Sequence, residues 1–175
     1  MPINSIVAGI RTYAAAYAAF QHLQDNHRDL LAPGDQKTGV IGEFYGMLFA
    51  KATYLSANVT YSEDPSQTGW DLQVTANPSG PDLRIQVKTV SGYSTTRSIT
   101  PLFPGWDHLY LFYLGRDLLP TGFWIVTTTA MMAGADSLRG LKMRRPDYPQ
   151  SGSPAVPWGE NRIMELRQLV PAIWP

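Results

Sequence analysis

The sequence of 175 residues contains no cysteine, which excludes disulfides, thiolate nucleophiles and any zinc site that needs sulfur ligands. It also lacks an apolar run long enough to cross a membrane. Charged residues make up only 16% of the chain and the net charge is zero, so overall charge favours no class of partner. The hydrophobic fraction of 44% is typical of a globular protein with a core. We therefore expect a single cytoplasmic domain over residues 1–175.

The N-terminal segment MPINSIVAGIRTYAAAYAAF predicts a helix of the fold rather than a targeting segment, because Arg11 interrupts its apolar run. The helix is expected over residues 5–30. One seam of this helix, at spacings of four and three residues, is expected to pack into the protein's own core, with a dimer contact as the alternative: Ile6, Ile10, Tyr13, Tyr17 and Phe20.

A second helix is expected over residues 38–55, after the break at Pro33 and Gly34. A stripe of small residues runs along it: Gly39, Gly42, Gly46 and Ala50. Each glycine costs a helix roughly 1 kcal/mol relative to alanine, so the stripe indicates close approach of another element. Glu43 lies within this stripe and would be carried against that element.

Five segments read as strands, because their residues alternate between apolar and polar or are apolar throughout. They cover residues 57–62, 69–76, 83–90, 108–114 and 123–129. The second and third are joined by NPSGPD, which predicts a β-hairpin. The segment TAMMAGADSLRG predicts one or two short helices and residues 145–160 a proline-rich loop, whereas RIMELRQLV is open between helix and strand.

The hairpin carries a polar face whose residues can be placed by register. Pairing the strands symmetrically about the turn puts Leu72 opposite Val87 and Asp71 opposite Lys88, which sorts apolar and polar side chains to opposite faces. Since side chains two residues apart share a face, Gln86 joins them. An ordinary solvated face with a cross-strand ion pair is the alternative reading of the same residues.

These residues, in their order, resemble the PD-(D/E)XK nuclease superfamily, which has the restriction-endonuclease-like fold. The matching positions are Glu43 in GEFYGMLFAKA, Asp71 in GWDLQV, and Gln86 and Lys88 in IQVK. The resemblance covers residues 38–126 and implies an α/β fold: a helix, a three-stranded antiparallel meander, a crossover and a fourth strand, in a central mixed sheet flanked by helices. Residues 1–37 would add an N-terminal helix, and residues 127–175 the C-terminal helices and proline-rich loop. Two features depart from the family pattern: Gln86 replaces the usual acid, and the crossover over residues 91–106 is short and contains prolines.

The resemblance implies a Mg²⁺-dependent endonuclease that hydrolyses DNA, with Mn²⁺ as a substitute, of restriction type and acting as a homodimer that cuts both strands. Glu43, Asp71, Gln86 and the backbone of Val87 would hold the metal, because hard cations prefer oxygen ligands, and Lys88 would orient or deprotonate the attacking water. Two alternatives stay open. One is an inactive nucleic-acid-binding module of the same fold, and the other is a nuclease toxin or repair enzyme acting on RNA or branched DNA.

Two further regions are candidates for contacts to the nucleic-acid backbone, with an ordinary polar surface as the alternative in both. The first is the polar loop at residues 91–106, with Tyr93, Arg97 and Thr100. The second is a basic cluster that includes Arg144 and Arg145. His22, His27 and His108 do not form a metal-ligand spacing.

Overall fold

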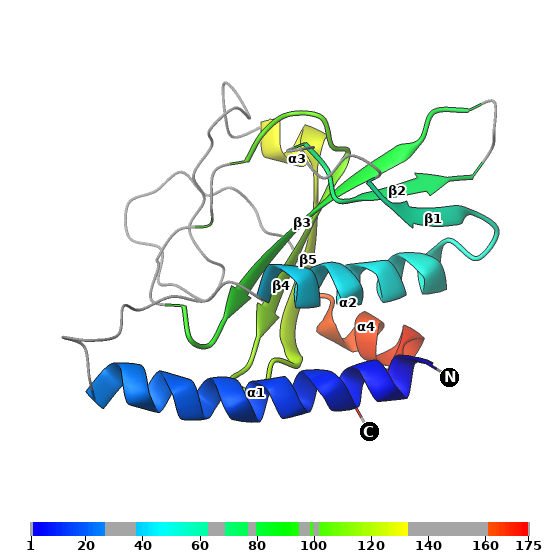
Figure 1. Ribbon diagram of the computed structural model, residues 1–175. Helices are drawn as coiled ribbons and strands as arrows, with labels where there is room; N and C mark the ends of the chain where they lie inside the picture. The colour runs from blue at the N-terminus through cyan, green and yellow to red at the C-terminus, as the bar shows by residue number, and fades with distance from the viewer. Residues whose placement is uncertain are drawn as a thin grey trace.

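The computed structural model describes residues 2–26, 38–62, 69–76, 80–94, 99, 102–132 and 161–174. Its centre is a five-stranded sheet in the order β1-β2-β3-β4-β5 (Figure 1). The strands are β1 (Asn58–Tyr61), β2 (Leu72–Thr75), β3 (Leu83–Ser91), β4 (His108–Leu114) and β5 (Pro120–Thr127). β1, β2 and β3 form an antiparallel meander, β4 runs parallel to β3, and β5 is antiparallel to β4. The predicted mixed sheet is therefore confirmed.

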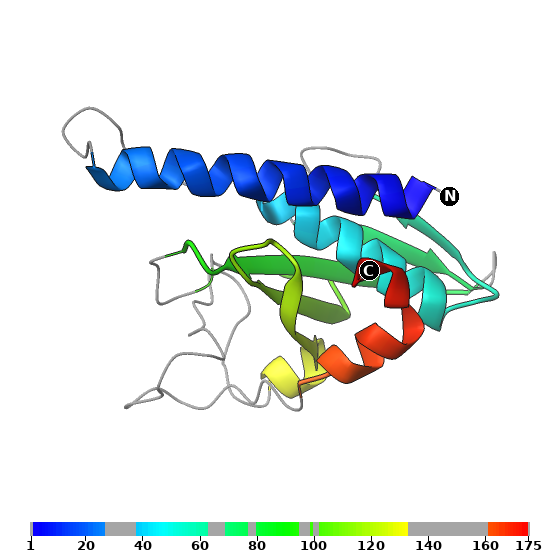
Figure 2. The same cartoon turned by 90° about the horizontal axis from the view of Figure 1, so that it is seen from below.

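Helices flank the sheet. α1 (Pro2–Asn26), α2 (Thr38–Thr53), α4 (Ile163–Leu169) and a 3₁₀ helix (Pro171–Ile173) lie on one side of it, with α1 running beside α2 (Figure 2). α3 (Thr128–Met132) packs on β5. The sequence left the C-terminal segment RIMELRQLV open between helix and strand, and the structure shows that it is a helix. Most of the helical segment predicted after residue 128, and the proline-rich loop, lie outside the described residues. Among the described helices, none combines the length and apolar character needed to cross a membrane.

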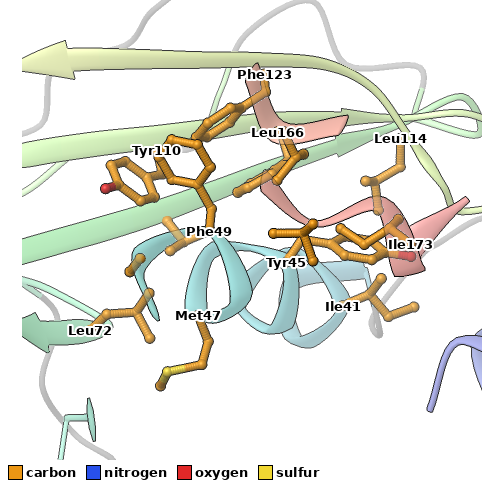
Figure 3. Packing of buried hydrophobic residues seen from close by; sticks show 14 of the residues in the cluster. Ile41, Tyr45, Met47, Phe49, Leu72, Tyr110, Leu114, Phe123, Leu166 and Ile173 are labelled. Carbon is orange, nitrogen blue, oxygen red and sulfur yellow. The ribbon is translucent and has the colours of Figure 1, made fainter. Parts of the chain in front are cut away.

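The main core lies between α2 and the sheet, where Tyr45 and Phe49 project from α2 toward the strands (Figure 3). The ring centroid of Phe49 lies 4.7 Å from that of Phe123 and 5.6 Å from that of Tyr110, both in edge-on arrangements. A second buried cluster, which includes Trp106, Leu109 and Val126, covers the other face of the sheet. Burial on both faces explains why β4 is apolar from Leu109 to Leu114.

The buried seam of α1 differs from the predicted one. Ile10 is buried and Tyr13 packs partly buried against the core, as expected, but Ile6 and Phe20 are 42% and 49% exposed. Val7 and Ala14, at 1% and 5% exposure, provide the buried contacts instead. α1 carries apolar residues on several sides, so two seams with the same spacing compete, and the small Ala14 side chain allows closer packing than the larger ones.

The hairpin register also differs from the prediction, by two residues. Leu72 pairs with Ile85 rather than Val87, and Val74 pairs with Leu83. A shift of two residues leaves every side chain on its predicted face, so the alternation of apolar residues could not detect it. The deciding residue is Asp82, whose carboxylate accepts hydrogen bonds from Thr75 Oγ1 at 2.6 Å and Gln73 Nε2 at 2.7 Å.

Candidate active site

Asp71 lies immediately before β2, at the point where this strand diverges from β3. Its backbone N–H donates to the carbonyl of Ile85 at 2.9 Å, and its Oδ2 accepts a hydrogen bond from the N–H of Val87 at 2.6 Å. The two bonds fall on either side of Gln86. The Asp71 carboxylate is thus fixed against the motif residues of β3.

Among the described residues, no strand pairs with the side of β3 that faces β2 beyond Asp71, because β2 pairs with β3 only from Leu83 to Ile85, and we call this side the open edge. In an extended strand the N–H and C=O of one residue point to the same side. The Val87 carbonyl therefore faces this open edge together with the N–H that Asp71 accepts. A carboxylate and a backbone carbonyl are both ligands that hard cations prefer.

Two members of the small-residue stripe of α2, Gly42 and Gly46, pack directly on β3 as the sequence indicated, whereas a Cβ on Gly39 would meet nothing within 4 Å. A Cβ on Gly42 would overlap the hydroxyl of Thr89, and one on Gly46 would lie 3.2 Å from Val87 Cγ2. Glu43 stands between these two close contacts. The helix therefore carries the Glu43 carboxylate to β3 at the level of Val87 and Thr89.

Electrostatics links the charged members of the site. Burial raises the pKa of Glu43, the negative charge of Asp71 raises it further, and the positive charge of Lys88 lowers it. Burial also raises the pKa of Asp71, against the hydrogen bond from Val87 and the charge of Lys88, which lower it. Two partly buried carboxylates and one lysine are thus close enough to affect one another's ionisation.

Gln86 and Lys88 approach this edge from the face of β3 opposite α2. Side chains alternate along a strand, so both share a face with Val90, which belongs to the second core cluster. Gln86 is almost completely buried, at 1% exposure, whereas Lys88 is only partly buried. Glu43 thus comes from one side of the sheet and Lys88 from the other, with Asp71 between them at the edge.

Two neighbours of the site were not predicted. Burial and the charge of Glu43 raise the pKa of Tyr61, which places this phenol at the end of β1 close to Glu43. Arg84, exposed on β3, holds its guanidinium carbon 4.1 Å from the centroid of the Trp70 ring, directly beside Asp71 in the chain. Strand alternation puts Arg84 on the same face of β3 as Lys88, so the sequence contained the information needed to place Arg84 beside the site. The position of Tyr61 depends on its pairing with Leu72, which the sequence pattern did not supply.

Of the residues predicted to contact nucleic acid, only Tyr93 lies within the described part of the chain. Tyr93 lies beyond the end of β3, where its hydroxyl donates to the carbonyl of Arg116 at 3.1 Å. It is not among the residues around Asp71. Arg97, Thr100, Arg144 and Arg145 lie outside the described residues.

No protein-family model matches this chain, and no curated protein matches it. Among solved structures, that of a bacterial homing endonuclease, I-Ssp6803I, aligns with 79% of this chain and 96% of its own. The TM-score is 0.43 and the sequence identity 15%. Similarity at this level carries no conclusion about family or function, so both are inferred from the residues of this chain.

Proposed function

We propose that this protein is a metal-dependent endonuclease that hydrolyses phosphodiester bonds in DNA, a QxK member of the PD-(D/E)XK superfamily. The observation that carries the proposal is the bond from Val87 N–H to Asp71 Oδ2, at 2.6 Å. It holds an acid beside the strand segment of Gln86 and Lys88, at an edge where Glu43 also arrives. An acid pair with a lysine at an open edge suits hydrolysis of an anionic diester.

The donor set fits a hard divalent cation. Glu43 and Asp71 are carboxylates whose pKa values are raised by burial, so a cation between them would relieve the unfavourable burial of negative charge. The Val87 carbonyl would complete the protein ligands, and water would fill the remaining positions, as Mg²⁺ commonly requires. The described residues include no group of three or more acidic or histidine side chains around a common point. When bound, the ion would acidify water and offset phosphate charge.

Each side chain of the site would then have its own role. Asp71, whose carboxylate is held in place by the N–H of Val87, would provide a fixed negative charge for the cation. Lys88 donates hydrogen bonds to the phosphate oxygens or to the attacking water, and its positive charge stabilises the negative charge that develops during attack. Arg84, held against Trp70 and free of ion pairs within the described part of the chain, is placed to contact a neighbouring phosphate.

A second candidate is a nucleic-acid-binding module of the same fold without catalysis. The observation that favours it is Gln86, a neutral and almost fully buried side chain where the superfamily usually has an acid. Under this candidate, Arg84 and Lys88 would still contact phosphates, but the two carboxylates would lack the third acidic ligand.

Plasmid cleavage distinguishes the two candidates. Supercoiled plasmid is incubated with the full chain and Mg²⁺ or Mn²⁺, and nicked and linear products are measured over time. We expect metal-dependent products, abolished by EDTA, and a loss of at least about 100-fold in rate for both Lys88→Ala and Asp71→Ala.

The matched control is Lys51→Ala, which removes an exposed lysine from the last turn of α2 and should leave the rate unchanged. If the wild-type protein binds DNA but cleaves neither DNA nor RNA, the proposed enzymatic function is wrong and the binding module is supported. Equal cleavage by Lys88→Ala and wild type would show that the activity does not arise at this site.

A further inference from the structure

Trp70, the residue before Asp71, packs against the second core cluster, on the face of the sheet opposite α2. The guanidinium carbon of Arg84 lies 4.1 Å from the centroid of the Trp70 ring. The ring nitrogen Nε1 is buried, and it has no hydrogen-bond partner in the part of the chain that the structure describes. Because a buried N–H without an acceptor is unfavourable, packing rather than hydrogen bonding determines where this ring lies.

The segment at residues 102–107, which leads into β4, also approaches this ring. A Cβ on Gly105 would lie 3.7 Å from Cε3 and Cζ3 of Trp70, and equally close to the Cα of Gly69. Gly105 has a φ of +122°, a conformation that glycine adopts readily and other residues rarely. A glycine at this position therefore brings the backbone of the segment close to the two residues that precede Asp71.

The same segment is fixed to the sheet two residues after Gly105. The N–H of Asp107 donates to the carbonyl of Arg84 at 2.8 Å, and Asp107 Oδ2 accepts a hydrogen bond from the N–H of Arg84, also at 2.8 Å. The Asp107 carbonyl accepts a hydrogen bond from the N–H of Thr128, the first residue of α3, at 2.8 Å. Gly105 thus lies on a backbone that is anchored to both β3 and α3.

Asp71 is placed by contacts on both of its sides in the chain. On the C-terminal side, Leu72 begins β2 and pairs with Ile85. On the N-terminal side, where β2 has not begun, the packed ring of Trp70 fixes the chain. The carboxylate between them accepts the Val87 N–H at 2.6 Å, and a bond this short requires the Asp71 backbone to stay in place.

We propose that Trp70 is a positioning residue for Asp71: its ring, held by Gly105 and the second core cluster, keeps the Asp71 carboxylate on the Val87 N–H at the open edge of β3. The positioning rests on the contacts above, whereas its effect on metal binding and cleavage rests on the proposed function. Arg84 is exposed, so we expect its side chain to contribute less to the position of the ring than the packed side does.

Hydrogen exchange of the Val87 amide, followed by NMR on the metal-free full chain, reports the position of Asp71, because this amide donates to its carboxylate. Trp70→Ala should speed the exchange at least about tenfold, as should Asp71→Ala, which removes the acceptor. Trp70→Phe should keep the exchange slow, because a phenyl ring retains most of the packing and has no N–H that needs an acceptor.

The matched control is Trp124→Ala, which removes another partly buried tryptophan packed against the same cluster, on β5. Thermal unfolding should show a similar destabilisation of Trp70→Ala and Trp124→Ala, but only Trp70→Ala should change the exchange of Val87 relative to the other amides of β3. Equal Val87 exchange in these two variants would overturn the proposal. Exchange in Trp70→Phe as fast as in Trp70→Ala would also overturn it, because packing would then not hold Asp71.

Gly105→Ala tests the same role from the segment that approaches the ring. Gly105 is exposed, so this variant should fold even if Trp70→Ala does not. A side chain at φ +122° is strained and should shift the segment away from Trp70, which speeds Val87 exchange by a smaller factor than Trp70→Ala. Unchanged Val87 exchange in Gly105→Ala would show that the segment does not hold the ring, and the proposal would be wrong.

Metal binding and cleavage separate the positioning role from the proposed enzyme. Trp70→Ala should bind Mn²⁺ several-fold more weakly and cleave plasmid with a lower kcat and little change in KM, because Asp71 is displaced while the DNA contacts remain. Faster Val87 exchange in Trp70→Ala, with no Mn²⁺ binding by wild type, would contradict the proposed enzyme and leave the positioning role standing. Mn²⁺ binding by wild type, with unchanged Val87 exchange in Trp70→Ala, would contradict only the positioning role.

Discussion

At the open edge of β3 the carboxylates of Glu43 and Asp71 share a partly buried position, whereas a surface hollow beside α1 is lined by charges of both signs, Arg11 and Arg116 with Asp25 and Asp117. The first region groups two acids with one lysine, whereas the second balances two arginines with two acids, as the whole chain balances its charges to zero. Their backbones differ as well. The edge depends on the close packing of α2 on β3, while the hollow depends on small residues of α1 that leave space. The distribution of charge over the fold is therefore more informative than its sum.

The largest effect that separates the two regions is expected from Gly42→Ala. The added Cβ would overlap the Thr89 hydroxyl and displace α2, with Glu43, from β3. Overpacking of this kind costs about 1–3 kcal/mol of unfolding free energy, measurable by urea denaturation. Cleavage should fall with it.

Gly39→Ala is the matched control in the same helix, because no atom lies within 4 Å of the Cβ it would add. It should be neutral or stabilise the helix by up to about 1 kcal/mol. If both alanine variants unfold at the same urea concentration, close packing of α2 does not position Glu43.

A smaller effect is expected from Glu43→Gln. The pKa of Glu43 is raised in the folded protein, so the stability linked to its proton is present below its ordinary pKa of 4.5 and is lost as the pH rises through the folded value. The variant should therefore unfold at higher urea than wild type at pH 7, by less than about 1 kcal/mol because the side chain is only partly buried.

The difference between Glu43→Gln and wild type should disappear below pH 4.5, where both side chains are neutral. Urea denaturation at pH 4 and pH 7 in metal-free buffer measures it. A variant less stable than wild type at pH 7 would mean that the carboxylate is favourably paired, and the edge would not be a site that needs a cation.

The smallest effect is expected from Arg84→Gln. If the guanidinium on Trp70 contacts one phosphate, the slope of the logarithm of DNA affinity against the logarithm of salt concentration should fall by about 1. Affinity should drop several-fold near physiological salt, with the turnover rate little changed. Arg167→Gln, which removes a guanidinium whose carbon lies 5.0 Å from the centroid of the Trp174 ring, serves as the control. An unchanged slope for Arg84→Gln would remove Arg84 from the DNA-contacting surface.

The sequence predicted most of this fold because its strands alternate or are largely apolar, and Gly42 and Gly46 of the glycine stripe correctly indicated close packing around Glu43. It did not predict the hairpin register, since a two-residue shift preserves the faces and the deciding contacts of Asp82 are side-chain hydrogen bonds. It placed Ile6 and Phe20 of α1 in the core where Val7 and Ala14 are buried, because apolar residues lie on several sides of this alanine-rich helix and neighbouring seams share Ile10.

The central claim is that Glu43 and Asp71 hold a divalent cation at the open edge of β3. Calorimetric titration of Mn²⁺ into wild type, Glu43→Gln and Asp71→Asn tests it directly. Wild type should show saturable binding, and each variant should bind at least about tenfold more weakly, because each loses a charged ligand. Identical titrations for the three proteins, or no binding by wild type, would contradict the claim.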